Sequence, residues 1–277
     1  MMRVKGIDRP PFQVSITPHR RSKMATKKKE TEISILEIQR GRIEFLIRGN
    51  SPLICNAMSA KVQQQLLLPP LKKNAAERAS TLKHDVMEEF RSSMYKARNP
   101  KSPTRIVMKA TAFKGALMSA ALDLPGTNKA QIGRLAYVEG DEIPIYGVPQ
   151  LMMSVTRNSD QNKTPDVRTR AILPEWACNI VVQYTTPILK EQAIVNLMAA
   201  AGITQGIGDW RVQKGSGNYG QFELTTPDDE TFKRIIKTGG LKAQDAAIED
   251  PVCYDSETDE LLSWYNVEVK RRGFKAV

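Results

Sequence analysis

Residues 206–222 read GIGDWRVQKGSGNYGQF, and this run decides how the rest of the chain is interpreted. It contains five glycines, two basic residues and three aromatic residues. Glycine adopts positive φ without steric cost, and a glycine-rich loop exposes backbone N–H groups that can bind phosphate. Trp210 and Tyr219 offer flat rings on which a base can stack, and Arg211 and Lys214 offer charge for a phosphate backbone. Two interpretations remain: a contact for nucleic acid, or a hairpin turn closed by an aromatic clamp.

The composition is that of a soluble globular chain. Its 277 residues are 41% hydrophobic, which suffices for a core, and no run approaches the ~18 apolar residues of a membrane span. The N-terminus has charges but no apolar segment typical of a secretory signal. The three cysteines are odd in number and widely spaced, which indicates a reducing compartment. We therefore expect no membrane partner and a cytoplasmic location.

The positive charge is concentrated at the N-terminus. Residues 1–29 contain nine Lys or Arg and one Asp, so they account for most of the net charge of +11. They also contain three prolines and show no apolar period, which predicts a disordered basic tail over residues 1–30. Translation from Met24 would remove most of this tail, so residues 1–23 are either native or an upstream extension. Because most of the net positive charge lies in this tail, a nucleic-acid site in residues 31–277 must contain cations of its own.

Catalytic and cofactor signatures are absent from the sequence. Only two histidines occur, and neither His19 nor His84 has a nucleophile near it in a recognisable pattern. No P-loop or dinucleotide-binding glycine motif occurs, and the cysteines lack metal-ligand spacing. We therefore predict no catalytic residue, no metal and no cofactor.

Hydrophobic periodicity divides the chain into alternating strands and helices. Ile43, Phe45 and Ile47 recur every second residue, as in a half-buried strand, and the same period recurs from Cys178 to Tyr184. The expected order is strand 33–48, helix 56–68, charged helical segment 71–98, helix 109–124, extended run 141–155, polar loop 156–171, strand 177–186, helix 188–201 and a last strand from Phe222.

The polar loop predicts a protruding hairpin. Residues 156–171 have no apolar pattern, which is typical of a long loop tip between two extended arms. The tip carries four cations that could contact a phosphate backbone: Arg157, Lys163, Arg168 and Arg170.

These elements predict the α+β class. Without insertions their order is β-α-β-β-α-β, that of a ferredoxin-like or RNA-recognition-type (RRM-like) core. We expect this core over residues 31–226, with a helical insertion at 56–105. Residues 227–277 are expected to form an extension for subunit contacts. Its stretch 245–260 contains seven acids and no Lys or Arg, which favours either a solvated face or a surface that docks on a neighbouring copy.

Two motifs resemble the repeat-associated mysterious protein (RAMP) superfamily, in particular the backbone-subunit family of CRISPR effector complexes. Residues 110–120, ATAFKGALMSA, are similar to the family's helix start, although Met118 stands where the family often has arginine. GNYGQF at 217–222 is similar to the superfamily's Gly-Tyr-Gly loop before the last strand. Asp209-Trp210-Arg211 is more similar to phage and prophage proteins of unknown role that carry an Ile-Gly-x-Trp-Arg segment.

The resemblance implies a non-catalytic, sequence-independent binder of single-stranded RNA or DNA that assembles head-to-tail into a filament. Other effector or phage replication subunits are further expected partners, in the cytoplasm of a prokaryotic cell or a phage-infected host. The resemblance also maps the family's protruding thumb onto a thumb-like hairpin at 142–175. Lys114 lies in the first turn of the predicted helix, where the helix dipole favours anions, and it could equally be solvated. Lys109, at the start of the same helix, is a further candidate contact, although its sequence context favours a solvated side chain.

Two other functions remain open. A phage protein that anneals or protects single-stranded DNA in recombination would have similar contacts. A metal-dependent RNase of the same superfamily would need an acidic loop residue near the bound backbone. The acidic loop residues form no recognisable metal-ligand cluster in the sequence: Asp123, Asp160, Asp166 and Asp209.

Overall fold

The computed structural model describes residues 36–68, 74, 82–157, 163–214 and 217–274. The chain divides into a unit over residues 1–37 and a second unit over 38–277, and the elements described below belong to the second. The predicted basic tail 1–30 and part of the hairpin tip, which includes Asp160, lie outside the described residues. Within the described part, no helix is both long and apolar enough to cross a membrane.

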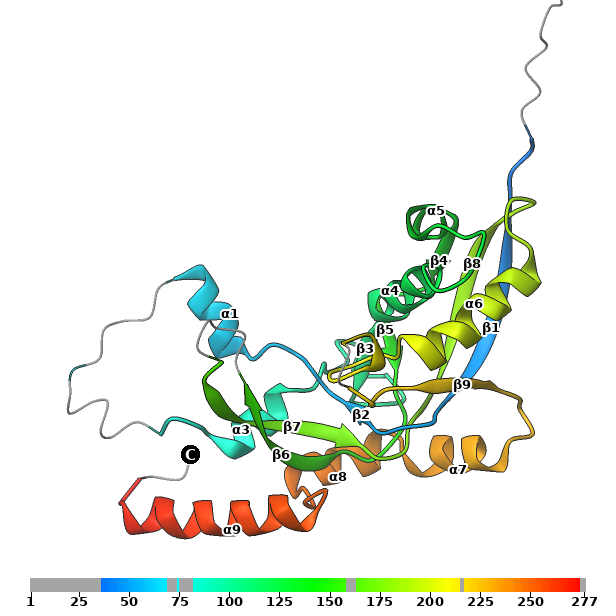
Figure 1. The fold of residues 1–277 in the computed structure, drawn as a ribbon. Helices are drawn as coiled ribbons and strands as arrows, with labels where there is room; N and C mark the ends of the chain where they lie inside the picture. Colours follow the sequence, from blue (N-terminus) through cyan, green and yellow to red (C-terminus); the bar gives the residue numbers. More distant parts are fainter. Residues whose placement is uncertain (1–35, 69–73, 75–81, 158–162, 215–216, 275–277) are drawn as a thin grey trace, which may run out of the picture. The chain divides into compact units, whose positions relative to one another are not determined.

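A four-stranded antiparallel sheet lies at the centre of this unit (Figure 1). Its strand order is β4-β8-β1-β9, and Phe45 of β1 stands opposite Ile180 of β8. Alternate side chains of β1 and β8 are buried, as the two-residue period predicts. The strands are β1 (Gln39–Gly49), β4 (Ala136–Val138), β8 (Ala177–Thr186) and β9 (Phe222–Thr225).

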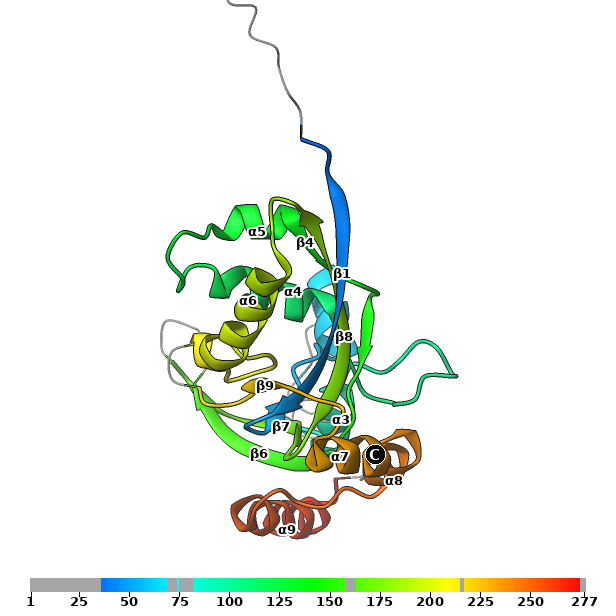
Figure 2. The same cartoon turned by 90° about the vertical axis from the view of Figure 1, so that its right-hand side faces the viewer.

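Two helices, α4 (Ala110–Ala120) and α6 (Glu191–Thr204), cover one face of this sheet, as Figures 1 and 2 show together. Phe113 and Leu117 of α4 and Met198 of α6 are fully enclosed in the main hydrophobic cluster. α5 (Lys129–Leu135) follows α4 and leads directly into β4. In chain order the sheet and its helices run β1, α4, β4, β8, α6, β9. The predicted α+β class is therefore confirmed.

A second sheet contains a long hairpin. β6 (Gln150–Arg157) and β7 (Pro165–Leu173) pair from Gln150 opposite Ile172 to Arg157 opposite Pro165, and β2 (Leu53–Ile54) pairs with the base of β7. The loop expected over 156–171 is thus wrong in extent, because both strands continue into that range. The outer half of β7 is exposed or half-exposed, so its strand is held by backbone pairing and leaves no apolar alternation in the sequence.

The extended run expected over 141–155 is also divided. β5 (Glu142–Pro144) pairs with β3 (Val107–Lys109) in a separate two-stranded sheet, and only the residues from Gln150 onward belong to the long hairpin. The backbone amide of Gly147 between these strands donates to the carbonyl of Gly239 (3.0 Å). The paired hairpin therefore spans 150–173 rather than 142–175.

The charged helical insertion contains two described helices, α1 (Ala60–Leu67) and α3 (Val86–Ser92). Val86, Phe90 and Met94 recur every four residues and are buried, so they form an apolar stripe that faces the core. The stripe is helical only to Ser92, because the chain turns there and Met94 packs from the following turn.

The C-terminal helices α7 (Glu230–Thr238), α8 (Leu241–Glu249) and α9 (Ser256–Arg271) pack onto the two sheets. α7 buries Phe232 and Ile235 against the face of β8 opposite α4 and α6. The chain between α8 and α9 hydrogen-bonds to Leu151 of β6 through the carbonyl of Val252 and the amide of Tyr254.

One buried side chain, Gln244 of α8, joins this segment to the core. Its Oε1 accepts from the amides of Arg105 and Ile106, both at 2.8 Å. Its Nε2 donates to the carbonyls of Ile145, Gly147 and Gly239 at 2.8–3.0 Å. The neighbouring Asp245 accepts two hydrogen bonds from the Arg105 guanidinium, which lowers the pKa of that carboxyl group. Asp245, one of the seven acids of stretch 245–260, is therefore engaged within the chain.

Candidate nucleic-acid interface

The glycine-rich loop between α6 and β9 folds back on itself in two layers. The amide of Ile207 donates to the carbonyl of Gly220, and the amide of Tyr219 donates to the carbonyl of Trp210. The layers touch so closely that a Cβ on Gly220 would lie 1.8 Å from the Ile207 carbonyl oxygen. Only glycine permits this approach, and Gly220 also has φ of +68°. The backbone of the loop therefore has a defined conformation, and it carries the side chains of Trp210 and Tyr219.

Trp210 lies on the outer side of this loop. Its indole is 36% exposed, and its backbone adopts φ of +46°, which is uncommon for a bulky residue. Its amide donates to Oδ1 of Asp209 (3.1 Å), which supports this conformation. Strained backbone of this kind concentrates at functional sites.

Tyr219 lies on the inner side. Its ring centroid is 6.2 Å from that of Trp210, with 38° between the ring planes. It packs against a small cluster formed by Ile54, Met152 and Ile172. The structure therefore assigns the two rings different surroundings: Tyr219 is half-buried on β2, β6 and β7, and Trp210 faces outward.

The loop and the hairpin form one hollow. Nη2 of Arg170 on β7 lies 3.4 Å from Oδ2 of Asp209, so an ion pair ties the two segments together. Side chains of β6, β7 and the loop line this hollow: Met152, Ser154, Thr156, Arg157, Arg168, Arg170, Asp209 and Trp210. Four of the predicted site residues are thus brought together, namely Trp210 and three arginines. We call this the Trp210 hollow.

The remaining predicted residues of this region lie beside the hollow. Arg211 uses two donors inside its own loop, with Nη1 on the carbonyl of Gly208 (3.0 Å) and Nε on Oε1 of Gln213 (3.1 Å). The Arg211 side chain therefore stabilises the conformation of the loop. Lys214 lies on the short turn η1 (Val212–Lys214), and Lys163 precedes the first residue of β7. Both side chains are exposed, and neither lines the Trp210 hollow or any of the other hollows described below.

Lys109 and Lys114 lie at a second hollow of about 640 Å³, at the start of α4. Lys109 Nζ stands 4.7 Å from the centroid of the Tyr95 ring, a cation–π contact. No side chain caps the N-terminus of α4 and no acid lies in its first turn, and the amide of Ala110 donates to the carbonyl of Asp141 (2.9 Å). Residues that the sequence analysis missed complete the lining, among them Tyr95, Lys96 and Tyr137. Single aromatic or basic residues outside a motif carry no signal in one sequence.

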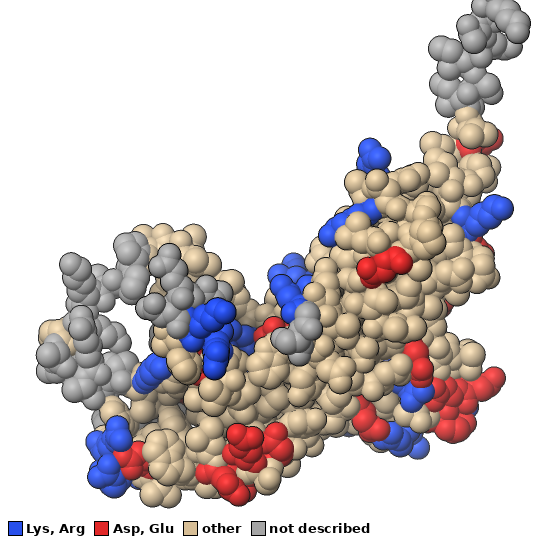
Figure 3. Space-filling model, in the orientation of Figure 1, with Lys and Arg blue, Asp and Glu red and all other residues tan. Residues whose placement is uncertain are grey.

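The hollows follow one another along the molecule. A third hollow, between α1 and β7, shares Arg168 and Arg170 with the Trp210 hollow and also touches Val62 of α1. The neighbouring Gln63 of α1 lines the hollow at α4. Figure 3 shows Lys and Arg side chains near the middle of this face, and Asp and Glu side chains together with further Lys and Arg side chains along the edge where α7 and α9 lie. Two of these hollows share lining residues, and five of the eight predicted cations border the three of them.

The described acidic loop candidates are each engaged with other side chains. Asp123 accepts from Nε2 of Gln205 (2.6 Å), and Asp209 pairs with Arg170. Asp166 accepts a hydrogen bond from Lys83 (2.8 Å) and lies 3.1 Å from Nε2 of His84; both partners lower its pKa. Across the described ranges, no group of three or more His, Cys, Asp or Glu side chains could hold a metal ion.

No protein-family model matches the sequence, and no curated protein matches it. Two solved structures are similar. A chain of the Type III-B Cmr-beta assembly bound to cognate target RNA is 13% identical with a TM-score of 0.28; the match covers 66% of this chain and 59% of that chain. Cmr6 from Pyrococcus furiosus is 8% identical with a TM-score of 0.33, over 68% of this chain and 98% of that one. At TM-scores below 0.5, neither similarity carries the interpretation of the site.

Proposed function

We propose that this protein binds single-stranded nucleic acid without sequence preference and without catalysis, as a subunit like those of CRISPR effector backbones. The observation that carries the proposal is the Trp210 hollow, in which an outward-facing indole stands beside Arg157, Arg168 and Arg170. Stacking on an aromatic ring beside cations accommodates every base, because every base has a π-face. The hollow therefore suits a flexible strand whose bases are unpaired.

The proposal includes a ferredoxin-like core. The chain order β-α-β-β-α-β and the strand order β4-β8-β1-β9 support it, because two interleaved βαβ units with antiparallel neighbours are that fold's topology. The glycine-rich loop then enters the last strand of the core, and the hairpin β6–β7 lies between its second and third strands in the chain. Both sides of the Trp210 hollow are thus connections of the core.

The absence of catalysis is part of the proposal. Asp123, Asp166 and Asp209 each have a partner within the chain, so none is held ready for a metal. A metal-dependent RNase would need one of them released. Annealing of phage single-stranded DNA would use the same surface, and the sugar 2′-hydroxyl would distinguish the RNA ligand from DNA.

Binding should weaken steeply with salt, and two arginines should account for part of that slope. For a single strand, log K falls against log salt with a slope of about −0.7 per phosphate neutralised. The double variant Arg157→Gln, Arg168→Gln should therefore have a slope shallower by about 1.4. Anisotropy titrations of a labelled 30-mer over a salt series measure it.

The matched control for charge is Lys237→Gln, which removes an exposed cation from α7 and should leave the slope unchanged. Tighter binding of the same sequence as a duplex, or binding that does not vary with salt, would contradict the proposal.

We further propose that copies assemble head-to-tail along the strand. Glu257 and Glu260 at the start of α9 are exposed, and no residue of α9 lines the hollow that contains the arginines of the hairpin. Contact between unlike surfaces is heterologous and propagates unless the rotation closes a ring.

Electron microscopy of the protein on a long single strand should therefore show continuous helical stretches. The variant Glu257→Lys, Glu260→Lys should leave isolated particles while retaining affinity for a short oligonucleotide. Symmetric dimers that do not depend on strand length would contradict the assembly.

A further inference from the structure

A hollow on the opposite side of α4 from the glycine-rich loop has the chemistry of a second base-stacking site. It measures about 480 Å³ and lies where β4, β8 and β1 meet α4 and α5. Its lining contains three cations and no carboxylate: Arg40, Lys114 and Arg134. The hollow at the start of α4, by contrast, also contains Asp141 and Glu142.

Tyr137 of β4 stands at the border of these two hollows and lines both. Its side chain is 51% exposed, although it lies in the central sheet opposite Gln183. It belongs to none of the hydrophobic clusters formed by the described residues. The ring therefore contributes little to the core, and one of its faces is open to a ligand.

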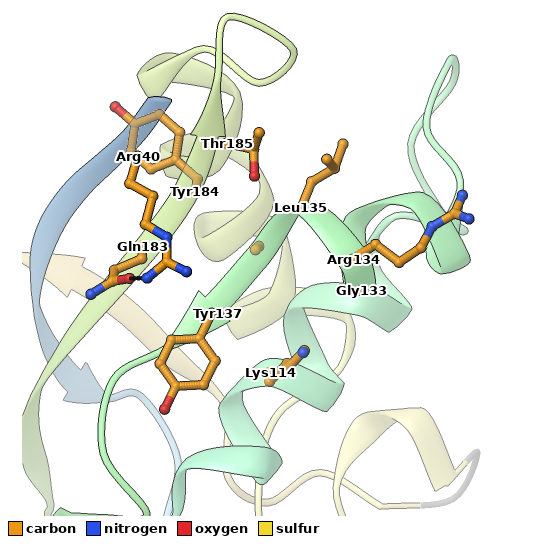
Figure 4. A pocket seen from close by; sticks show the side chains of 10 residues that line it. Arg40, Lys114, Gly133, Arg134, Leu135, Tyr137, Gln183, Tyr184 and Thr185 are labelled. Carbon is orange, nitrogen blue, oxygen red and sulfur yellow. Dashed lines mark hydrogen bonds between the residues drawn. The ribbon is translucent and has the colours of Figure 1, made fainter. Parts of the chain in front are cut away.

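Two cations flank the ring. Figure 4 shows Arg40 and Lys114 on two sides of Tyr137, whereas Arg134 points away. Arg40 is held by a hydrogen bond from Nη1 to Oε1 of Gln183 (3.3 Å). Within the described part of the chain, neither Arg40 nor Lys114 makes an ion pair, so both charges are available to an anion. An exposed ring between two such cations matches a nucleotide, whose base stacks while its phosphates contact the cations.

We propose that Tyr137 stacks a base of the bound single strand and that Lys114 and Arg40 contact the adjoining phosphates. The inference rests on the proposed function and adds residues that the loop and hairpin do not supply. Because Lys114 and Tyr137 also line the hollow at the start of α4, a strand leaving that hollow would reach Tyr137 next. The strand would then contact both the hairpin and the edge strand of the core.

Four variants test the assignment with a single strand short enough to hold one copy, so that contacts between copies do not contribute: Tyr137→Ala, Tyr137→Trp, Trp210→Ala and Trp264→Ala. Tyr137→Ala should raise Kd by about 5- to 150-fold, the loss expected for one base–aromatic stack, and Tyr137→Trp should restore binding. Trp264→Ala is the matched control, because that side chain is 60% exposed on α9, and it should bind like the wild type. A strand carrying 5-iodouridine should also cross-link to the peptide that contains Tyr137.

The outcomes separate this inference from the proposed function. If Trp210→Ala weakens binding and Tyr137→Ala does not, the second site is wrong and the proposed function stands. If the wild type binds no single strand, both are wrong. If a labelled polyglutamate peptide binds in a Tyr137-dependent way while Tyr137→Ala leaves oligonucleotide affinity unchanged, the hollow takes an acidic protein segment and the inference is overturned.

Discussion

Replacing Gln244 with leucine is expected to lower the free energy of unfolding by about 3–5 kcal/mol. The side chain is fully buried and hydrogen-bonds to five backbone groups, two N–H and three C=O, from three separate segments. Leucine fills similar volume but satisfies none of these groups. Each buried polar group left without a partner costs about 1–3 kcal/mol, and partial relaxation keeps the total below the sum.

Urea denaturation followed by far-ultraviolet circular dichroism measures this change. The matched control is Gln192→Leu in α6, because Gln192 is exposed and bonds only to Asn196; its effect should stay within about 0.5 kcal/mol. A Gln244→Leu protein as stable as the control would contradict the role of this side chain. It would also contradict the packing of residues 239–249 against the core.

Replacing Trp210 with alanine is expected to raise Kd for a single strand by about 5- to 150-fold with little loss of stability. The side chain is 36% exposed, so truncation removes a contact surface more than a core residue. Tyr219→Ala should show the reverse balance, because its ring packs on Ile54, Met152 and Ile172. Its unfolding free energy should fall by about 1–3 kcal/mol, less than for a fully buried ring.

Melting and binding must be measured on the same samples, so that affinity is expressed per folded molecule. A large loss of stability in Trp210→Ala with unchanged affinity would show that the indole stabilises the loop and does not contact the strand. Equal behaviour of the two variants would show that the distinction between an outer and an inner ring is wrong.

The elements of the central sheet could be predicted from the sequence because their burial is periodic. Ile43, Phe45 and Ile47 recur every second residue, and so do Cys178, Ile180 and Val182, which are fully buried. The outer hairpin could not be predicted in this way. In the outer half of β7, Pro165 and Arg168 are exposed and Asp166 and Val167 are only partly buried, so no run of alternating buried residues marks this part of the strand.

The site was predictable only where several informative residues are adjacent in the chain. The glycine-rich loop concentrates Trp210, Arg211 and Lys214, and it indicated the interface. Tyr137 could not be found, because one tyrosine in a short strand has no neighbouring signal. Gln244 could not be found either, since an isolated glutamine in a helix is more often exposed.

Hydrogen–deuterium exchange of the protein with and without a saturating single strand tests the central claim most directly. A strand that lies between the glycine-rich loop and the hairpin should slow exchange in both, including the segments around Trp210 and the outer parts of β6 and β7. Exchange in α7 should not change, because that helix packs on the opposite face of the sheet. Protection confined to α7–α9, or no protection at a strand concentration that saturates binding, would contradict it.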